Sequence, residues 1–268
     1  MKDAPRLDNL FAMIRERPVF DLSQPLKHGM PVLPIHPPFC FSLHRRHGDR
    51  MYADGVSSAN DQVFMSLHTS THIDAIGHFS KDGRLFGGID VATHQTGPGG
   101  MAAHGIETVQ PILRRAVLLD VAGFKDRSTL DPDYIITSKD LEAVARAEGV
   151  DLRPGDVVLV RTGWAQFWDD PSVFLGVGSS VPGPTLEGAR WLAAAGVSIV
   201  GGDHAAFEFW PTQGQVHGFL LAERGIHIIE NLNLEELAKE KVYSFLFVAL
   251  PLRFVGATAS PIRPLAIV

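Results

Sequence analysis

Short apolar runs alternate with amphipathic segments through the second half of the chain. The apolar runs predict strands at residues 116–121, 157–161, 197–200, 226–229 and 245–250. Helical periodicity between them predicts helices at residues 139–148, 186–195 and 234–241. Thr137 and Asp140 are spaced as a capping box, and Asn233 is placed to cap the last helix. This alternation predicts an α/β fold, a mixed sheet with flanking helices and buried central strands.

The N-terminal third has a different pattern. Five prolines between positions 25 and 38 divide it into short extended pieces, and residues 63–67 predict a strand that leads into a histidine-rich segment. No internal repeat, flexible linker or low-complexity tract separates this part from the rest. We therefore expect a single domain over residues 1–268.

Composition narrows the classes of partner. The chain has 268 residues, 45% of them hydrophobic, which is enough to bury a core and excludes disorder as the main state. A net charge of -6 without long charged runs provides no basic surface for nucleic acid or anionic lipid. The longest apolar stretch, residues 242–255, is shorter than the roughly 18 residues of a spanning helix. We expect a small-molecule substrate, and neither nucleic acid nor membrane as a partner.

Cysteine content and the first residues predict the compartment. Cys40 is the single cysteine, so no internal disulfide can form. Residues 1–20 carry charged side chains where a signal peptide would need an apolar stretch. Both features favour a cytoplasmic protein.

Histidine is the residue type that stands out, with twelve copies. The segment LHTSTHIDAIGHF contains His68, His72, Asp74 and His78. On an extended strand His68 and His72 would lie about 13 Å apart, too far for one metal ion, whereas residues four apart on a helical turn are neighbours. The backbone must therefore curl if these side chains share an ion. Spacing alone leaves both a metal site and surface or capping histidines open.

A second group follows downstream. His217 and Glu230 flank the apolar strand at residues 225–229, and could complete the first site or build another. The alternatives are that Glu230 caps the helix near residue 234 and that His217 is a buried, hydrogen-bonded histidine. Asp203, His204 and Glu208 follow another buried strand, and for these we favour structural or ligand-orienting roles over direct chemistry.

Aromatic residues near these segments are expected to be mainly core. Phe39 is the exception, because it lies on the proline-rich loop, and we expect it to contact the substrate.

Together these motifs resemble the metal-dependent cyclase or kynurenine formamidase-like hydrolases, which include bacterial arylformamidases and isatin hydrolases. The signature of that family is close to HxGTHxDxPxH, and this chain reads HTSTHIDAIGH at residues 68–78. Further similar segments are DLSQPLKHGMPVLPIHPPF, GDVVLVRTGW, VHGFLLAERGIHIIENLNL and GATASPIRPLAIV. The resemblance therefore covers most of the chain.

The resemblance implies a role for each site residue. It implies that His68, His72 and Asp74 hold one metal ion, that Asp74, His217 and Glu230 hold a second ion in dinuclear members, and that His78 is catalytic. It also implies the swivelling β/β/α fold, and a homodimer or higher homo-oligomer in which the proline-rich loop of one subunit covers the pocket of another.

Three positions bear on the branch of the family. Ser70 replaces the glycine of the signature, and Ile76 replaces the proline that is usual among arylformamidases, as in the isatin hydrolase branch. By the same resemblance, isatin hydrolases have a serine at the position of Glu230. The glutamate found here instead favours a two-metal site. Substrate branch and number of ions stay open.

The ligand types indicate the chemistry. Imidazole and carboxylate ligands without a thiolate suit zinc or manganese, and do not distinguish the two. A divalent ion lowers the pKa of its bound water and polarises a carbonyl, and His78 could carry a proton to the leaving nitrogen. The alternative for His78 is that it only orients a ligand.

We therefore expect a metal-dependent hydrolase of the C–N bond in an N-acyl aryl amine or cyclic amide. The alternatives are a lactone hydrolase or cyclase of the same family, and a catalytically inactive member that binds metal or ligand. All six proposed positions are intact, which favours an active enzyme. A serine hydrolase is disfavoured because no G-x-S-x-G elbow occurs. A dinucleotide site at GPGGMA is disfavoured because Pro98 lies inside the turn and no apolar strand precedes it.

Overall fold

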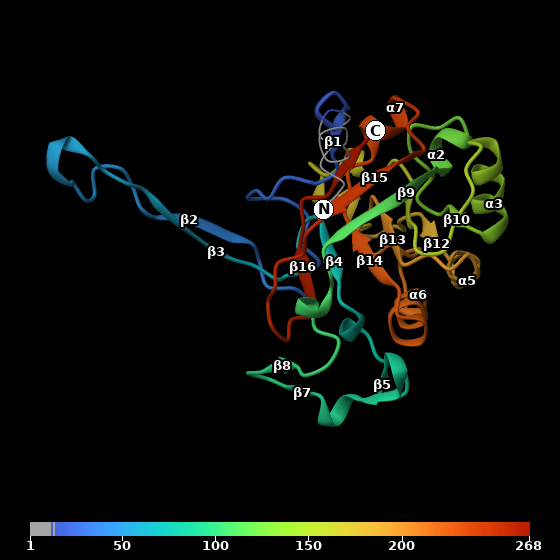
Figure 1. Ribbon diagram of the computed structural model, residues 1–268, viewed down its shortest axis with the longest axis horizontal. Helices are drawn as coiled ribbons and strands as arrows, with labels where there is room; N and C mark the ends of the chain where they lie inside the picture. Colours follow the sequence, from blue (N-terminus) through green and yellow to red (C-terminus); the bar gives the residue numbers. More distant parts are fainter. Residues whose placement is uncertain (1–11, 13) are drawn as a thin grey trace, which may run out of the picture.

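The computed structural model describes residue 12 and residues 14–268. Residues 1–11 and 13, within the segment predicted not to be a signal peptide, lie outside the described residues. In the described part of the chain, no helix has both the length and the apolar composition of a membrane span. The body is built around one curled sheet, and a long hairpin projects from it (Figure 1).

Nine strands form the central sheet, in the order β1-β17-β15-β9-β11-β13-β14-β4-β16. Their bounds, in that order, are Val19–Asp21, Leu265–Ile267, Ser244–Ala249, Ile112–Asp120, Val157–Arg161, Ile199–Gly202, His227–Glu230, His72–Asp74 and Ala259–Pro261. The strands β9, β11, β13 and β14 are parallel to one another, and every other pairing within this sheet is antiparallel. The carboxyl ends of the four parallel strands therefore lie along one edge of the sheet.

Both faces of the sheet are buried, which explains the continuous apolar runs. On β9, Val117 and Leu119 belong to one core cluster, whereas Ala116 and Leu118 belong to the other. The first cluster includes residues of α3 (Ser138–Ala147) and α5 (Leu186–Ala194), which cover the same side of the sheet (Figure 1). The second includes Leu237 of α7 (Glu235–Lys239). This is the α/β architecture expected from the sequence.

The remaining elements are short. The strand pairs outside the main sheet are β2 (Cys40–Arg45) with β3 (Asn60–Phe64), β5 (Arg84–Leu85) with β6 (Ile89–Asp90), β7 (Gln95–Thr96) with β8 (Gly100–Met101), and β10 (Ile135–Ile136) with β12 (Gly183–Pro184). The helices are α2 (Val121–Phe124), α4 (Pro171–Phe174) and α6 (Gln215–His217), and α6 continues into a π-helix, η7 (Gly218–Arg224). Single 3-10 turns are η1 (Ala53–Gly55), η2 (Ile76–His78), η3 (Phe86–Gly88), η4 (Val91–Thr93), η5 (Ile106–Thr108) and η6 (Trp164–Phe167).

The predicted strands and helices of the second half are confirmed, with shifts of a few residues at their ends. The capping box is also confirmed: the Thr137 hydroxyl accepts from the Asp140 amide, and the Asp140 carboxylate accepts from the Thr137 amide. The predicted cap of the last helix is wrong. Leu234, which is fully buried, occupies that position, and Asn233 Oδ1 instead accepts from the Glu235 amide at 3.3 Å.

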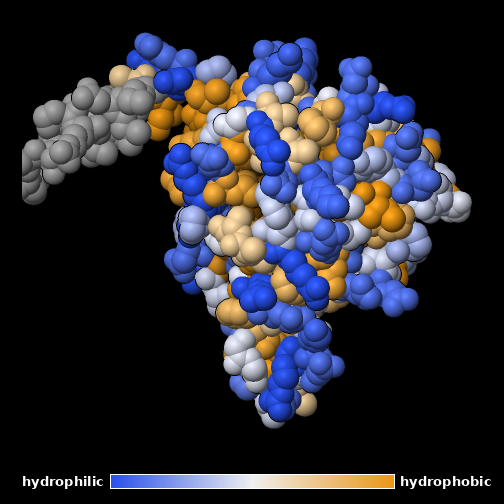
Figure 2. All heavy atoms as spheres, turned by 90° about the vertical axis from the view of Figure 1, so that its right-hand side faces the viewer, coloured by the Kyte–Doolittle hydropathy of each residue, from blue (hydrophilic) through white to orange (hydrophobic). Residues whose placement is uncertain are grey.

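The strand expected at residues 63–67 is also placed wrongly. It is β3, which ends at Phe64 because its partner β2 begins opposite, at Cys40. These two strands form the projecting hairpin, called here the arm (residues 40–64; Figure 1). Nearly all of its strand residues are exposed, and they include the apolar Phe41, Leu43, Val63 and Phe64. The face of the body shown in Figure 2, which is the right-hand side of Figure 1, differs from the arm in that hydrophilic residues are interspersed among the hydrophobic ones.

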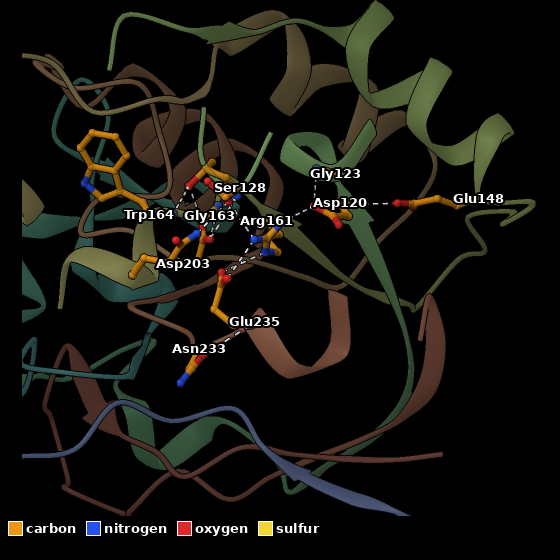
Figure 3. A network of polar contacts seen from close by, with 12 residues as sticks. Asp120, Gly123, Ser128, Glu148, Arg161, Gly163, Trp164, Asp203, Asn233 and Glu235 are labelled. Carbon is orange, nitrogen blue, oxygen red and sulfur yellow. Dashed lines mark hydrogen bonds and ion pairs between the residues drawn. The ribbon is translucent and has the colours of Figure 1, made fainter. Parts of the chain in front are cut away.

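A buried polar network joins the carboxyl ends of β9, β11 and β13 (Figure 3). Arg161 Nη1 donates to Asp120 Oδ1 at 2.7 Å, and its Nε and Nη2 each donate to a different Glu235 oxygen at 2.9 Å. Burial opposes the charge of Arg161, but these carboxylates outweigh it and raise the pKa of the guanidinium. Asp203 accepts from the amides of Thr162 and Gly163 at the end of β11. The network therefore fixes neighbouring strand ends beside the end of β14, where Glu230 lies.

Candidate metal centre

The histidine-rich segment adopts the curl that its spacing requires. Residues 67–71 bend, residues 72–74 form β4, and residues 76–78 form a 3-10 turn. The bend is held from outside: the Thr71 hydroxyl donates to the Asn231 carbonyl at 2.6 Å, and Asn231 Nδ2 donates to the Ser70 carbonyl at 2.8 Å. Antiparallel pairing of β4 with β14 then places His72 opposite Glu230. Two segments far apart in the sequence thus meet at the sheet.

Six predicted site residues come together at this point. Asp74 lies in the middle: its Oδ1 is 2.9 Å from His68 Nδ1 and 3.5 Å from His72 Nε2, and its Oδ2 is 3.7 Å from His217 Nε2. Glu230 closes the other side, with Oε1 at 3.0 Å from His217 Nε2 and Oε2 at 3.4 Å from His72 Nε2. The sixth is His78, whose ring centroid is 4.1 Å from that of His68.

The ligand atoms form two groups that share Asp74. In one group, atoms of His68, Asp74 and His78 all lie within 4.8 Å of one another, and in the other, atoms of Asp74, His217 and Glu230 do so. The second group is the set that the resemblance implies. The first differs from the implied set, because His78 takes the place of His72. His72 Nε2 instead lies between the two carboxylates of Asp74 and Glu230.

The electrostatics of the cluster are dominated by buried carboxylates. Asp74, Glu208 and Glu230 are only 1%, 3% and 5% exposed. Burial would lower the pKa of His217, but hydrogen bonds to Glu208 and Glu230 outweigh it and raise this pKa to about 10. Burial also opposes the charge of Asp74, yet His78 and His68 hold its pKa well below the usual range. His217 thus supplies one buried positive charge to a group of three buried carboxylates, and the excess of carboxylates favours a further cation beside them.

The donor set fits a divalent cation. His72 Nε2 and both carboxylate oxygens of Asp74 are buried and make no hydrogen bond within the described part of the chain. Buried polar atoms without partners are costly, so their convergence needs another partner. Nitrogen and oxygen donors without a thiolate are those that zinc and manganese accept.

Glu208 orients His217 from behind. Its carboxylate accepts from His217 Nδ1 and from the Val216 amide, the latter at 3.1 Å, so that His217 Nε2 faces Asp74 and Glu230. A carboxylate that holds the far nitrogen of a histidine is a common feature of metal sites. The geometry matches the ligand-orienting role expected for Glu208. Asp203 and His204 are fully buried and belong to neither group of candidate ligands.

The aromatic residue beside the cluster is Phe79. Its ring centroid is 4.8 Å from that of His78 and 4.9 Å from that of His217. Phe39 is half-buried, packs on the cluster around Trp164 and Trp168, and has its ring 5.7 Å from His28. Its contact with substrate stays a prediction. Phe79, which directly follows His78, is one of the aromatic residues expected from the sequence to be mainly core.

A family comparison identifies the chain's relatives. The family model Cyclase, described as "Putative cyclase", matches residues 20–208, which include the segment from His68 to His78. The chain belongs to the Cyclase family. The match covers most of the chain and confirms the family predicted from the sequence.

Named relatives of this family are hydrolases. The chain is 29% identical to a kynurenine formamidase of Sphingopyxis alaskensis, over 91% of this chain and 95% of that protein. It is 25% identical to an isatin hydrolase of Roseibium aggregatum, over 93% of this chain and 91% of that protein. Among solved structures, a novel cyclase is similar with a TM-score of 0.88 and 30% identity, over 99% of this chain and 93% of that chain. The predicted fold class is thereby confirmed.

Proposed function

We propose that this protein is a metal-dependent hydrolase that cleaves the C–N bond of an N-acyl aryl amine or a cyclic amide. The single observation that supports it best is the convergence of buried ligand atoms of His72 and Asp74, which make no hydrogen bond in the described part of the chain, beside Glu230 and His217. The named relatives, a kynurenine formamidase and an isatin hydrolase, supply the reaction class.

We assign the metal ligands to five residues: His68, His72, Asp74, His217 and Glu230. The proposed ion is zinc or manganese, one or two per subunit, and Asp74 would be shared between two. A divalent ion at this place would lower the pKa of a water molecule and polarise the substrate carbonyl.

The protein's own groups then manage the proton. Burial lowers the pKa of His78 to about 3, so that its imidazole is uncharged at pH 7. In hydrolysis, the water oxygen bonds to the acyl carbon, the C–N bond breaks, and a water proton must reach the leaving nitrogen. We assign this transfer to His78, which lies beside Asp74 and Phe79.

Replacing His78 with alanine is expected to lower kcat by about 100-fold or more, the usual contribution of a positioned acid–base group, while metal content stays unchanged. Elemental analysis and steady-state kinetics on the same preparation check both parts. If the ion is lost together with the activity, His78 is a ligand in the group with His68 and Asp74, and its assignment as the proton carrier is wrong.

The reaction class is tested with a substrate panel. Protein purified without added metal is assayed for bound ions and then for hydrolysis of N-formyl aryl amines, aryl lactams and the matching aryl lactones. We expect bound zinc or manganese and turnover of at least one amide class. Metal-free protein that cannot be reconstituted would refute the metal proposal, and turnover of the lactones alone would replace the amide assignment.

We also propose that the protein is a homo-oligomer. The arm supports this, because a two-stranded hairpin is marginally stable alone in water and this one exposes Phe41 and Phe64 at 45% and 62%. A second copy of the chain is the partner that the resemblance implies.

Sedimentation velocity tests the assembly. The wild type is expected to sediment as a dimer or larger, and Phe41→Glu on the arm is expected to shift it toward the 29.2 kDa monomer. Val177→Glu is the control, because Val177 is exposed at 67% but lies outside the arm. A wild-type monomer, or equal behaviour of the two variants, would rule out the arm as the contact.

A further inference from the structure

A cavity of about 470 Å³ lies behind Phe79, outside the metal cluster. It is built by residues that follow His78, by α5, and by α6 with the π-helix η7, and α5 and α6 are neighbours in Figure 1. Its volume falls in the range of small-molecule sites. Phe79 forms a wall shared by both places, since its ring also contacts His78 and His217.

The backbone around the cavity is unusual. The π-helix Gly218–Arg224 begins directly after His217, and π-helical segments are rare and often found at functional sites. Gly214, before α6, has a positive φ of 73°. A Cβ at Gly214 would lie 2.7 Å from Phe79 Cε1, so the glycine permits the close approach of the Phe79 ring. Both features give the wall its shape.

The lining combines an apolar surface with one available cation. Phe79, Leu186 and Phe219 supply the apolar part. Lys81 is already paired with Glu223. Arg190, on α5, has its Cζ 5.9 Å from the Phe219 ring centroid, and no ion pair joins it to any carboxylate in the described part of the chain. One unpaired guanidinium beside aromatic walls suits a single negative charge on an aromatic body.

We propose that this cavity binds a small aromatic monocarboxylate, with Arg190 pairing the carboxylate and Phe79 and Phe219 contacting the ring. The site is separate from the metal cluster, and binding there does not depend on the proposed reaction. Phe79 connects the cavity to the metal cluster, because its ring lines the cavity and also contacts His217. Only the Phe79 side chain would separate a ligand in the cavity from His217.

Calorimetric titration of the whole protein with benzoate tests the proposal. We expect saturable binding, and at least about tenfold weaker binding of the uncharged benzamide, because a charge-assisted hydrogen bond is then lost. Arg190→Gln is expected to weaken benzoate binding by about the same factor and to leave benzamide unaffected. Arg190 is exposed, so this variant should fold normally.

Two further variants locate the site. Arg224 also stacks on Phe219, at 5.2 Å, but does not line the cavity, so Arg224→Gln should bind benzoate as the wild type does. His72→Ala alters the metal cluster and should also leave benzoate binding unchanged. Loss of binding in His72→Ala would place the carboxylate at the cluster and overturn the proposal, as would unchanged binding in Arg190→Gln or no binding to the wild type.

Discussion

His72→Ala is expected to remove bound metal and to lower hydrolytic activity by more than about 10³. His72 is 1% exposed, and its Nδ1 contacts the Ser70 carbonyl at 2.8 Å, which turns Nε2 toward Asp74 and Glu230. Removing a ligand should cost more affinity than the roughly 10- to 100-fold typical of an outer partner. Loss of ion-assisted stabilisation, worth several kcal/mol, corresponds to about 10³ in rate for each 4 kcal/mol.

Metal analysis after dialysis and kinetics with saturating added ion would measure both effects. His94→Ala is the matched control, because among the described residues the His94 ring hydrogen-bonds within its own turn, to the Asp90 carbonyl and the Thr93 hydroxyl, and belongs to neither ligand group. It should keep metal and activity. A His72→Ala protein that retains full metal content and activity would mean that His72 has a structural role only.

Arg161→Leu is expected to lower the free energy of unfolding by about 3–5 kcal/mol, the cost of breaking a buried ion pair from one side. Asp120 is 5% exposed and would lose its ionic partner, and Glu235 would lose both of its hydrogen bonds from the guanidinium (Figure 3). Arg161→Lys keeps the positive charge but loses the forked arrangement of donors. Its free energy of unfolding should therefore lie between those of the wild type and Arg161→Leu.

Denaturant unfolding measures this change. Arg146→Leu provides the control: Arg146 pairs with Glu142 four residues earlier on an exposed helix face, and such pairs contribute about 0.3–0.5 kcal/mol. If Arg161→Leu and Arg146→Leu unfold at the same denaturant concentration as the wild type, the network does not stabilise the fold.

Elements of the fold could be predicted from the sequence where a single physical effect, such as burial on both faces of a sheet, determines the pattern of residues. The runs at β9 and β11 are apolar throughout because both sheet faces are buried, so they were recognisable without a structure. The arm was not recognisable as a projection, because exposed strands with Phe41 and Val63 read like buried ones. The cap of α7 was also predicted wrongly: the buried, apolar Leu234 occupies that position, which a rule based on polar capping residues does not anticipate.

The sequence indicated which residues lie in the cluster, but not how they are grouped around one another. Spacing drew attention to His68, His72, Asp74 and His78 but left a metal site and surface or capping histidines open, and the resemblance to the family gave each residue its expected role. The register of β4 with β14, which brings Glu230 to His72, depends on pairing that no local pattern encodes. Which of His72 and His78 groups with His68 depends on the curl of residues 67–71, which the sequence leaves open.

The short loop of residues 231–234 joins a carboxylate of each polar system, one at the end of β14 and one at the start of α7. Glu230 faces the cluster at one end, and Glu235 contacts Arg161 at the other. Between them the backbone is held by its amides, with Asn231 bonded to the His204 carbonyl and Leu232 to the Gly202 carbonyl. We therefore expect motion at one end of this short connection to affect the other end. Binding of an ion at the metal cluster should then slow hydrogen exchange of the α7 amides relative to the ion-free protein, although α7 holds none of the proposed ligands.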